Sequence, residues 1–273
     1  MTAVSPILLV LIAFALYLYL SRRRASELLG RPFPPSWQDI LATRLPVYAC
    51  LSQQEQERLR HLIKRFIADK RFYGCGGQVI SDEIRVTIAA EACLLLVNKQ
   101  GDVYPGLSSV LVYPTGFLVE REQHRPDGTV ASGEHSLLGE SWSNGKVILS
   151  WDDVEKGVAD FTDGHNVVLH EFAHQLDAES GSTNGAPPLR RNSYKTWATV
   201  FAENFEELRS SALLGHQTVM DRYGATSPAE FFAVATETFF EKPRQLYDMH
   251  PELYDELERY YQIDPRLWTY PAT

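Results

Sequence analysis

The sequence feature that most restricts the fold is a segment with two histidines four residues apart, His170-Glu171-Phe172-Ala173-His174. On an α-helix such residues lie on one face, with β-carbons about 5–6 Å apart. Two imidazoles at this separation can share one zinc ion, each nitrogen at about 2.0–2.1 Å. Glu171 lies about 100° around the helix from His170. Its carboxylate can therefore face a metal-bound water without binding the metal itself.

The alternative for this pattern is a pair of surface histidines on an amphipathic helix. The surrounding segment argues against it, because it is rich in apolar residues: Val167, Val168, Leu169, Phe172, Ala173 and Leu176. We expect one helix over Asp163–Asp177, with Asp163 as its N-cap. Zinc lowers the pKa of a bound water to about 7. Glu171 is then the expected general base, taking the water's proton and passing it to a leaving amine.

A catalytic zinc site needs a third protein ligand and one open position. Asp177 follows His174 by three residues and could bind the metal, although such residues more often orient an imidazole. Ser227-Pro228-Ala229-Glu230 predicts a helix start, with Ser as N-cap and Pro at the first position. Glu230 could therefore be only a capping residue. Glu237 lies seven residues further on the same face. The spacing alone does not decide between Glu230 and Glu237.

Charge and cysteine content narrow the class of protein. The 273 residues carry a formal net charge of −9, which argues against nucleic acid as a partner, because such binding depends on Lys and Arg neutralising phosphates. The three cysteines, Cys50, Cys75 and Cys93, form no C-x-x-C pair. We expect buried free thiols in a reducing compartment.

The N-terminus predicts a membrane anchor. Residues 3–20 carry no charged side chain, and a helix of this length reaches about 27 Å, enough for a hydrocarbon core. The alternative is a cleaved signal peptide, but that has its positive charge before the apolar run. Here Arg22, Arg23 and Arg24 follow it. The positive-inside rule then leaves residues 25–273 in the cytoplasm.

The pattern of charged, apolar and proline residues divides the chain into an anchor, a tether and one domain. We assign residues 1–24 to the anchor and its basic flank, 25–36 to a proline-rich tether, and 37–268 to one domain. In its helical part, about 37–100, Ser52 and Glu55 form a capping box before apolar residues at helical spacing. A second helix is expected near 82–98. The catalytic part, about 101–268, contains two predicted strands, Val110–Tyr113 and Val147–Trp151, then helices and a loop at Gly181–Pro188.

Several separated blocks, in one order over residues 32–268, resemble the Mlc titration factor A family of zinc-dependent peptidases. They are Leu45-Pro46, Leu51-Ser-Gln-Gln-Glu-Gln56, Val112-Tyr-Pro114, Gly139-Glu-Ser-Trp142, Val147-Ile-Leu-Ser-Trp151, His170-Glu-Phe-Ala-His-Gln-Leu-Asp177, Pro228-Ala-Glu-Phe-Phe-Ala-Val234 and Asp264-Pro265.

The resemblance implies an α+β, zincin-like metallopeptidase fold, with Val147–Trp151 at its substrate-pairing edge. In this family, and in the related catalytic domain of anthrax lethal factor, a Tyr stands seven residues before the ligating Glu. Tyr223 and Glu230 match that spacing. The resemblance thus implies one Zn²⁺ held by His170, His174 and Glu230, with Glu171 as base. It also implies that the phenol of Tyr223 donates a hydrogen bond to the oxyanion that develops during hydrolysis. Glu237 is then expected to contact the ligands without binding the metal.

Two features of this chain differ from the family's pattern and affect how far the family's site residues apply to it. The titration factor itself has no evident membrane span, whereas residues 3–20 predict one in this chain. Some members also place an extra histidine before the G-x-S-W block, and His135 is near that region but not at the matching spacing. We expect His135 to be a loop residue. The remaining histidines show no pairing pattern: His61, His124, His165, His216 and His250.

Three functions compete at this point. The first is a zinc peptidase acting on peptides or proteins, aminopeptidase-like by resemblance, tethered to the cytoplasmic face of a bacterial inner membrane. The second is a regulatory binding protein that sequesters a transcriptional repressor of sugar uptake. The third is an anchored scaffold whose zinc is structural, which the complete H-E-x-x-H argues against, since structural sites normally have four protein ligands.

Overall fold

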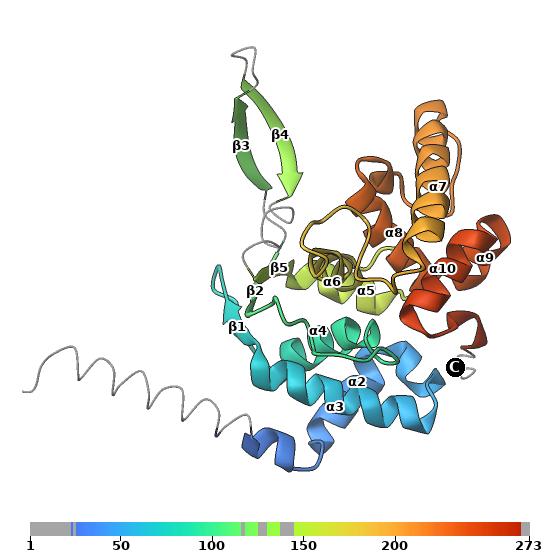
Figure 1. Cartoon of the computed structure of the whole chain (residues 1–273). Coiled ribbons are helices and arrows are strands. Elements are labelled where there is room, and N and C mark those ends of the chain that lie inside the picture. Colours follow the sequence, from blue (N-terminus) through green and yellow to red (C-terminus); the bar gives the residue numbers. More distant parts are fainter. Residues whose placement is uncertain (1–22, 24–25, 116–117, 125–129, 137–144, 269–273) are drawn as a thin grey trace, which may run out of the picture.

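The structure is a computed structural model that describes residue 23 and residues 26–115, 118–124, 130–136 and 145–268. Helices pack around a small parallel sheet and continue into a helical C-terminal half (Figure 1). The α-helices are α2 (Pro35–Arg44), α3 (Gln53–Asp69), α4 (Asp82–Leu94), α5 (Trp151–Ala159), α6 (Val167–Ala178), α7 (Tyr194–Leu214), α8 (Pro228–Glu241), α9 (Pro243–Met249) and α10 (Pro251–Tyr261). Short 3₁₀ helices are η1 (Pro46–Cys50), η4 (Arg222–Ala225) and η5 (Pro265–Leu267).

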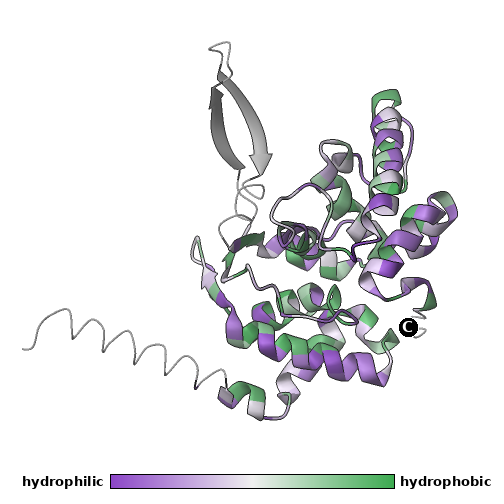
Figure 2. Cartoon of the chain, in the orientation of Figure 1, coloured by the Kyte–Doolittle hydropathy of each residue, from purple (hydrophilic) through white to green (hydrophobic). Residues whose placement is uncertain are grey.

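The capping box predicted before α3 is confirmed. The Ser52 hydroxyl accepts the backbone N–H of Glu55, and the Glu55 carboxylate accepts the N–H of Ser52 at 2.9 Å. The predicted apolar face of α3 is buried at Leu59, Leu62, Ile63 and Phe66. The helix expected near 82–98 is α4, which ends at Leu94. Hydrophobic and hydrophilic residues alternate along α3, α7 and α10, as expected for helices with one buried face (Figure 2).

Three parallel strands form the sheet, in the order β1 (Arg71–Gly74), β2 (Ser109–Tyr113) and β5 (Lys146–Ser150). Val110 lies opposite Val147 and Val112 opposite Leu149, and all four side chains are fully buried. Both predicted strands are therefore present, and β5 is an edge strand of the sheet among the described residues. β1 was not predicted from the sequence.

The second predicted strand ends one residue earlier than expected. The hydroxyl of Ser150 accepts the backbone N–H of Asp153, so Ser150 is the N-cap of α5. Trp151 is accordingly the first residue of a helix and not the last residue of a strand.

A hairpin of β3 (Leu118–His124) and β4 (Val130–Ser136) projects from the body between β2 and β5 (Figure 1). His135 lies opposite Val119 in the antiparallel register, so the expectation that it is a loop residue is wrong. The G-x-S-W block at 139–142 lies outside the described residues, as does the link at 125–129.

The N-terminal segment meets the domain at α3. The ammonium of Lys64, a buried side chain, donates hydrogen bonds to the backbone carbonyls of Leu29 and Arg31. The anchor predicted at residues 3–20 lies outside the described part of the chain. Within the described part, no helix is long and apolar enough to cross a membrane.

The core continues beneath the motif helix. Phe172, on α6, has no exposed surface, and its ring centroid lies 4.9 Å from that of Tyr104 and 5.6 Å from that of Phe66. Helix α6 packs against α4, α5 and α8. The fold therefore fixes α6 from several sides, and α8 lies along the side from which a third ligand can come.

Candidate metal centre

Two helices bring three potential metal ligands together. The Nε2 atoms of His170 and His174, both on α6, lie 3.2 Å apart. The Oε2 atom of Glu230, in the first turn of α8, lies 3.0 Å from the Nε2 of His170 and 3.2 Å from that of His174. Among the described residues this is the one group of three His, Cys, Asp or Glu side chains placed to hold a metal ion.

The donor set fits zinc. Two imidazole nitrogens and one carboxylate oxygen are the protein ligands of many catalytic zinc sites. The side chains of His170, His174 and Glu230 are only 12%, 0% and 13% exposed, so the site is largely shielded from water. Burial lowers the pKa of His174 to about 4, which leaves its imidazole neutral, as a ligand must be. Burial opposes ionisation of Glu230, but hydrogen bonds from both histidines lower its pKa to about 2.

Glu237 contacts the opposite side of His170. Its Oε1 lies 2.7 Å from the Nδ1 of His170, and its Oε2 accepts the backbone N–H of Asn166 at 2.6 Å. A carboxylate in this place fixes the ring orientation of a ligating histidine and raises its basicity. Glu230 and Glu237 thus lie at different nitrogens of one imidazole, and only Glu230 faces both Nε2 atoms.

Helix α6 begins at Val167, so the prediction of Asp163 as its N-cap is wrong. The N-cap is Asn166, whose side-chain oxygen accepts the backbone N–H groups of Val168 and Leu169. Gly164 has φ +79°, a left-handed conformation that ends the preceding turn. Asp163 instead accepts the N–H of His165 within that turn.

A buried polar layer lies behind this helix start, and sequence reasoning missed it. The Asn166 amide donates to Glu91 of α4 at 2.9 Å, and the N–H of Gly164 donates to Glu241 of α8 at 2.9 Å. Burial raises the pKa of Glu91 to about 8 and that of Glu241 to about 9. Both carboxyls are therefore neutral at pH 7. A glutamate inside an otherwise apolar helical stretch is the signal that could have identified them.

Glu171 and Tyr223 lie beside the three candidate ligands. Glu171 has no exposed surface. Tyr223, in η4, is 50% exposed, and its ring centroid lies 5.9 Å from that of His170. Partial burial and the negative charges of Glu230 and Glu171 raise the pKa of Tyr223 to about 12. Its phenol therefore keeps its proton at neutral pH and can act as a hydrogen-bond donor.

Asp177 holds a loop and does not join the candidate ligands. Its two carboxylate oxygens accept the backbone N–H groups of Gly185 and Ala186, at 2.7 and 3.0 Å. Gly185 has φ +80°, and a β-carbon there would collide with the carbonyl oxygen of Pro228. Since Pro228 is the first residue of α8, this loop connects the C-terminal end of α6 to the start of the helix that carries Glu230.

The other histidines lie elsewhere. His61 and His216 are exposed, and His165 lies 4.0 Å from Asp221 on the surface. The imidazole of His250 is hydrogen-bonded to Asn204. The side chains of His124 and His135 fall outside what the structure describes.

We predict that Glu237→Gln weakens zinc binding by about 10–100-fold while one zinc still binds per chain, as expected when a residue that orients a ligand loses its charge. Glu230→Gln should weaken binding much more. Competition with a chelator of known affinity measures both, and Glu206→Gln on the surface of α7 is the control. Loss of zinc from the Glu237 variant but not from the Glu230 variant would reverse the assignment.

We also predict a pH-dependent gain in stability from Glu91→Gln. Because the pKa of Glu91 is raised from 4.5 to about 8, the folded chain keeps a proton that the unfolded chain loses. The stability linked to this carboxyl is therefore complete below pH 4.5 and is lost as the pH rises toward 8. The glutamine keeps the acceptor for Asn166 but does not ionise. The urea-unfolding midpoint of the variant should exceed that of wild type increasingly over this window. A constant difference, as expected for Glu206→Gln, would contradict the prediction.

Comparison with known proteins places this site in a family. The chain is 46% identical over 245 residues to an uncharacterised protein of Synechocystis, covering 89% of each. It is 33% identical to Mlc titration factor A of Serratia proteamaculans, covering 84% of this chain and 87% of that protein. The corresponding protein of Yersinia pestis is 29% identical, with 91% and 90% covered. Residues 19–262 match the profile of one peptidase family. The chain therefore belongs to the glucose-regulated metallo-peptidase M90 family.

Proposed function

We propose that the chain is a zinc-dependent peptidase that hydrolyses peptide bonds at the centre formed by His170, His174 and Glu230. The observation that carries this proposal is the approach of Glu230 to within 3.2 Å of both Nε2 atoms, with Glu171 and Tyr223 alongside. Membership of a metallopeptidase family supports the same chemistry. The zincin-like fold belongs to this proposal and is supported by the helix-rich architecture with a small sheet ending in the edge strand β5.

The roles of the chain's own residues follow from their positions. A bound zinc ion supplies a polarised water and a Lewis acid for the peptide carbonyl. Glu171 accepts the proton of the attacking water and transfers it to the leaving amine. The phenol of Tyr223, protonated at neutral pH, donates a hydrogen bond to the oxygen that becomes negative in the transition state. Glu237 keeps the His170 ring in place throughout.

A structural role for the metal fits these contacts less well. Structural zinc sites normally have four protein ligands. Among the described residues, three side chains converge here. Helix α6 carries two further carboxylates. Glu171 has the role of general base in this proposal, and Asp177 is occupied by backbone N–H groups of its loop. One position is thereby left for a water or a substrate.

A second candidate function is the binding of a protein regulator. It is favoured by the relatives named Mlc titration factor A, at 33% and 29% identity over most of their length. Under this proposal the chain sequesters a transcriptional repressor of sugar uptake such as Mlc. Hydrolysis and sequestration can coexist in one chain.

We predict that Glu171→Gln retains zinc and fold but lowers peptide hydrolysis by about 10²–10⁴-fold, the usual contribution of a general base. Assays on short peptides with free and acetylated N-termini also test the aminopeptidase-like mode, which requires the free amine. Undiminished hydrolysis by this variant would eliminate the mechanism.

Capture of Mlc by the same inactive variant would support the binding function, and absence of capture would remove it.

We further propose that residues 3–20 anchor the chain in the bacterial inner membrane, with the peptidase domain in the cytoplasm. Residues 3–20 are uncharged and are followed by three arginines, and the family match begins only at residue 19. We predict that a C-terminal reporter is active on the cytoplasmic side, and that the chain leaves the membrane fraction when residues 1–24 are deleted. Reporter activity on the far side would contradict the orientation.

A further inference from the structure

A cavity of about 690 Å³, separate from the candidate metal centre, lies at the C-terminal end of α6. Four segments line it: Lys99 and Gln100 after α4, Glu179 at the end of α6, residues 188–190 with Ser193 and Trp197 around the start of α7, and the last turns of α10 with Gln262. None of the candidate ligands, nor Glu171 or Tyr223, is among its lining residues. Its volume is within the range of small-molecule sites, about 300–1,000 Å³.

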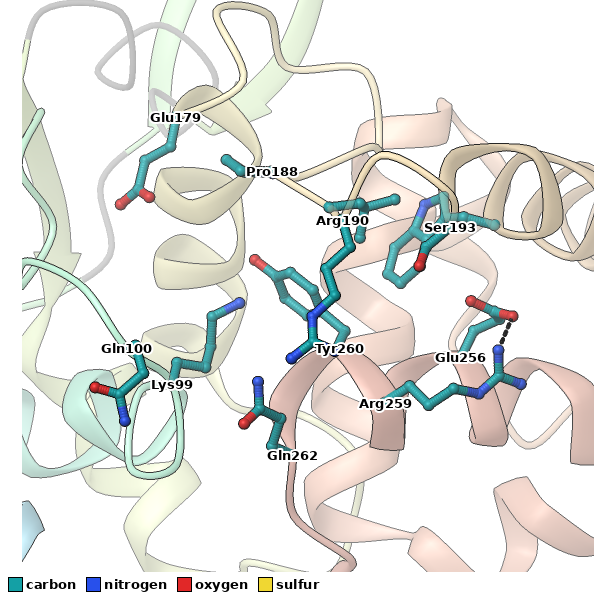
Figure 3. A pocket seen from close by; sticks show the side chains of 12 residues that line it. Lys99, Gln100, Glu179, Pro188, Arg190, Ser193, Glu256, Arg259, Tyr260 and Gln262 are labelled. Carbon is teal, nitrogen blue, oxygen red and sulfur yellow. Dashed lines mark hydrogen bonds and ion pairs between the residues drawn. The ribbon is translucent and has the colours of Figure 1, made fainter.

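Two cations reach into this cavity without a carboxylate partner. Figure 3 shows the ammonium of Lys99 and the guanidinium of Arg190 directed into the same space, above the side chain of Gln262. Among the described residues, Arg190 forms no side-chain hydrogen bond or ion pair, and no carboxylate lies within salt-bridge distance of Lys99. By contrast, Arg259, at the same rim, is paired with Glu256 at 2.5 Å.

The ammonium of Lys99 contacts an aromatic ring but, in the described part of the chain, has no carboxylate beside it as a counter-charge. It lies 3.2 Å from the ring centroid of Tyr260, an attractive contact but one without a counter-charge. Burial lowers the pKa of Lys99 to about 7, and the charge of Glu179 only partly opposes this effect. An anion in the cavity supplies the missing counter-charge and recovers part of the cost of removing the ammonium from water.

The walls of the cavity are held in place by hydrogen bonds. The side chain of Asn98 donates to the backbone carbonyl of Gln262 at 3.0 Å, which joins the segment after α4 to the end of α10. The indole of Trp197 donates to the carbonyl of Gly185 at 2.9 Å, and its ring stacks on Phe201. The cavity is therefore preformed, which reduces the entropy that a ligand loses on binding.

The charges select the class of ligand. Arg259 of the lining is paired with Glu256, and Lys99 and Arg190 outnumber the remaining carboxylate, Glu179, which disfavours a metal ion or an organic cation. Nucleic acid is also disfavoured, because its binding requires many Lys and Arg side chains on one surface, and this chain has a net charge of −9. Gln100, Ser193 and Gln262 add groups that can donate to or accept from hydroxyl or amide groups of a ligand.

We propose that this cavity binds a small organic anion, whose carboxylate or phosphate oxygens accept hydrogen bonds from Lys99 and Arg190. Gln262 and Ser193 contact the polar groups of its body, and Glu179 contacts a hydroxyl or amide donor. The site is independent of the peptidase chemistry proposed above, since it shares no side chain with the metal centre.

Isothermal titration of the full-length, zinc-loaded protein with succinate and with inorganic phosphate tests the proposal and distinguishes the two oxyanions. At least one probe should bind at one site per chain. Lys99→Met and Arg190→Gln should each weaken that binding by about 10–100-fold, as expected for a lost hydrogen bond to a charged group. Arg190 is exposed, so its variant remains informative if Lys99→Met does not fold.

Two matched variants distinguish binding in this cavity from binding elsewhere on the chain. Arg209→Gln, on the surface of α7, should leave binding unchanged, as should Glu171→Gln, the variant predicted to lower hydrolysis. The proposal is overturned if neither probe binds at millimolar concentration. It is also overturned if Lys99→Met and Arg190→Gln bind the probe as tightly as wild type, since the anion then lies at the metal centre or elsewhere, or if Arg209→Gln weakens binding equally.

Discussion

The arrangement of this protein depends on one imidazole held between two carboxylates of a single helix. His170 has Glu237 at 2.7 Å from its Nδ1 and Glu230 at 3.0 Å from its Nε2. These glutamates are seven residues apart on α8, so they project from the same side, about two turns apart. The packing of α8 along α6 therefore sets both the orientation of the His170 ring and the position of the third candidate ligand. Any shift between the two helices would disturb both contacts together.

Much of the surrounding structure keeps these two helices in register. At the start of α6, Asn166 contacts Glu237 and Glu91, and Gly164 contacts Glu241. At its other end, Asp177 holds the loop that passes against Pro228, the first residue of α8. Buried carboxyls reduce stability as the pH rises, because their neutral forms are kept against the tendency to ionise. This loss of stability falls on carboxyls that hold the candidate centre in place. Groups with strongly shifted pKa values are common at functional sites.

The loop after α6 also forms a wall of the cavity proposed to bind an anion. Residues 188–190 and Ser193 line that cavity, and Gly185, a few residues earlier, is hydrogen-bonded to Asp177 and Trp197. The same segment thus contacts the proposed anion site on one side and the base of α8 on the other. On this acidic chain Lys99 is notable, because burial lowers its pKa to about 7 while its ammonium lies over the ring of Tyr260.

The sequence by itself determined the local features. The four-residue spacing of His170 and His174 requires one helical face, and Ser52 with Glu55 specifies a helix start, because these interactions involve residues within one or two turns. The family followed from motif order. Only the tertiary structure decided which of Glu230 and Glu237 faces both Nε2 atoms, since the two share a helix face and the packing of α8 along α6 places them at different nitrogens of His170. It also decided the true N-cap of α6, Asn166, and the loop-holding role of Asp177, because their partners, such as Glu237 and Gly185, are brought close only when separate segments pack together.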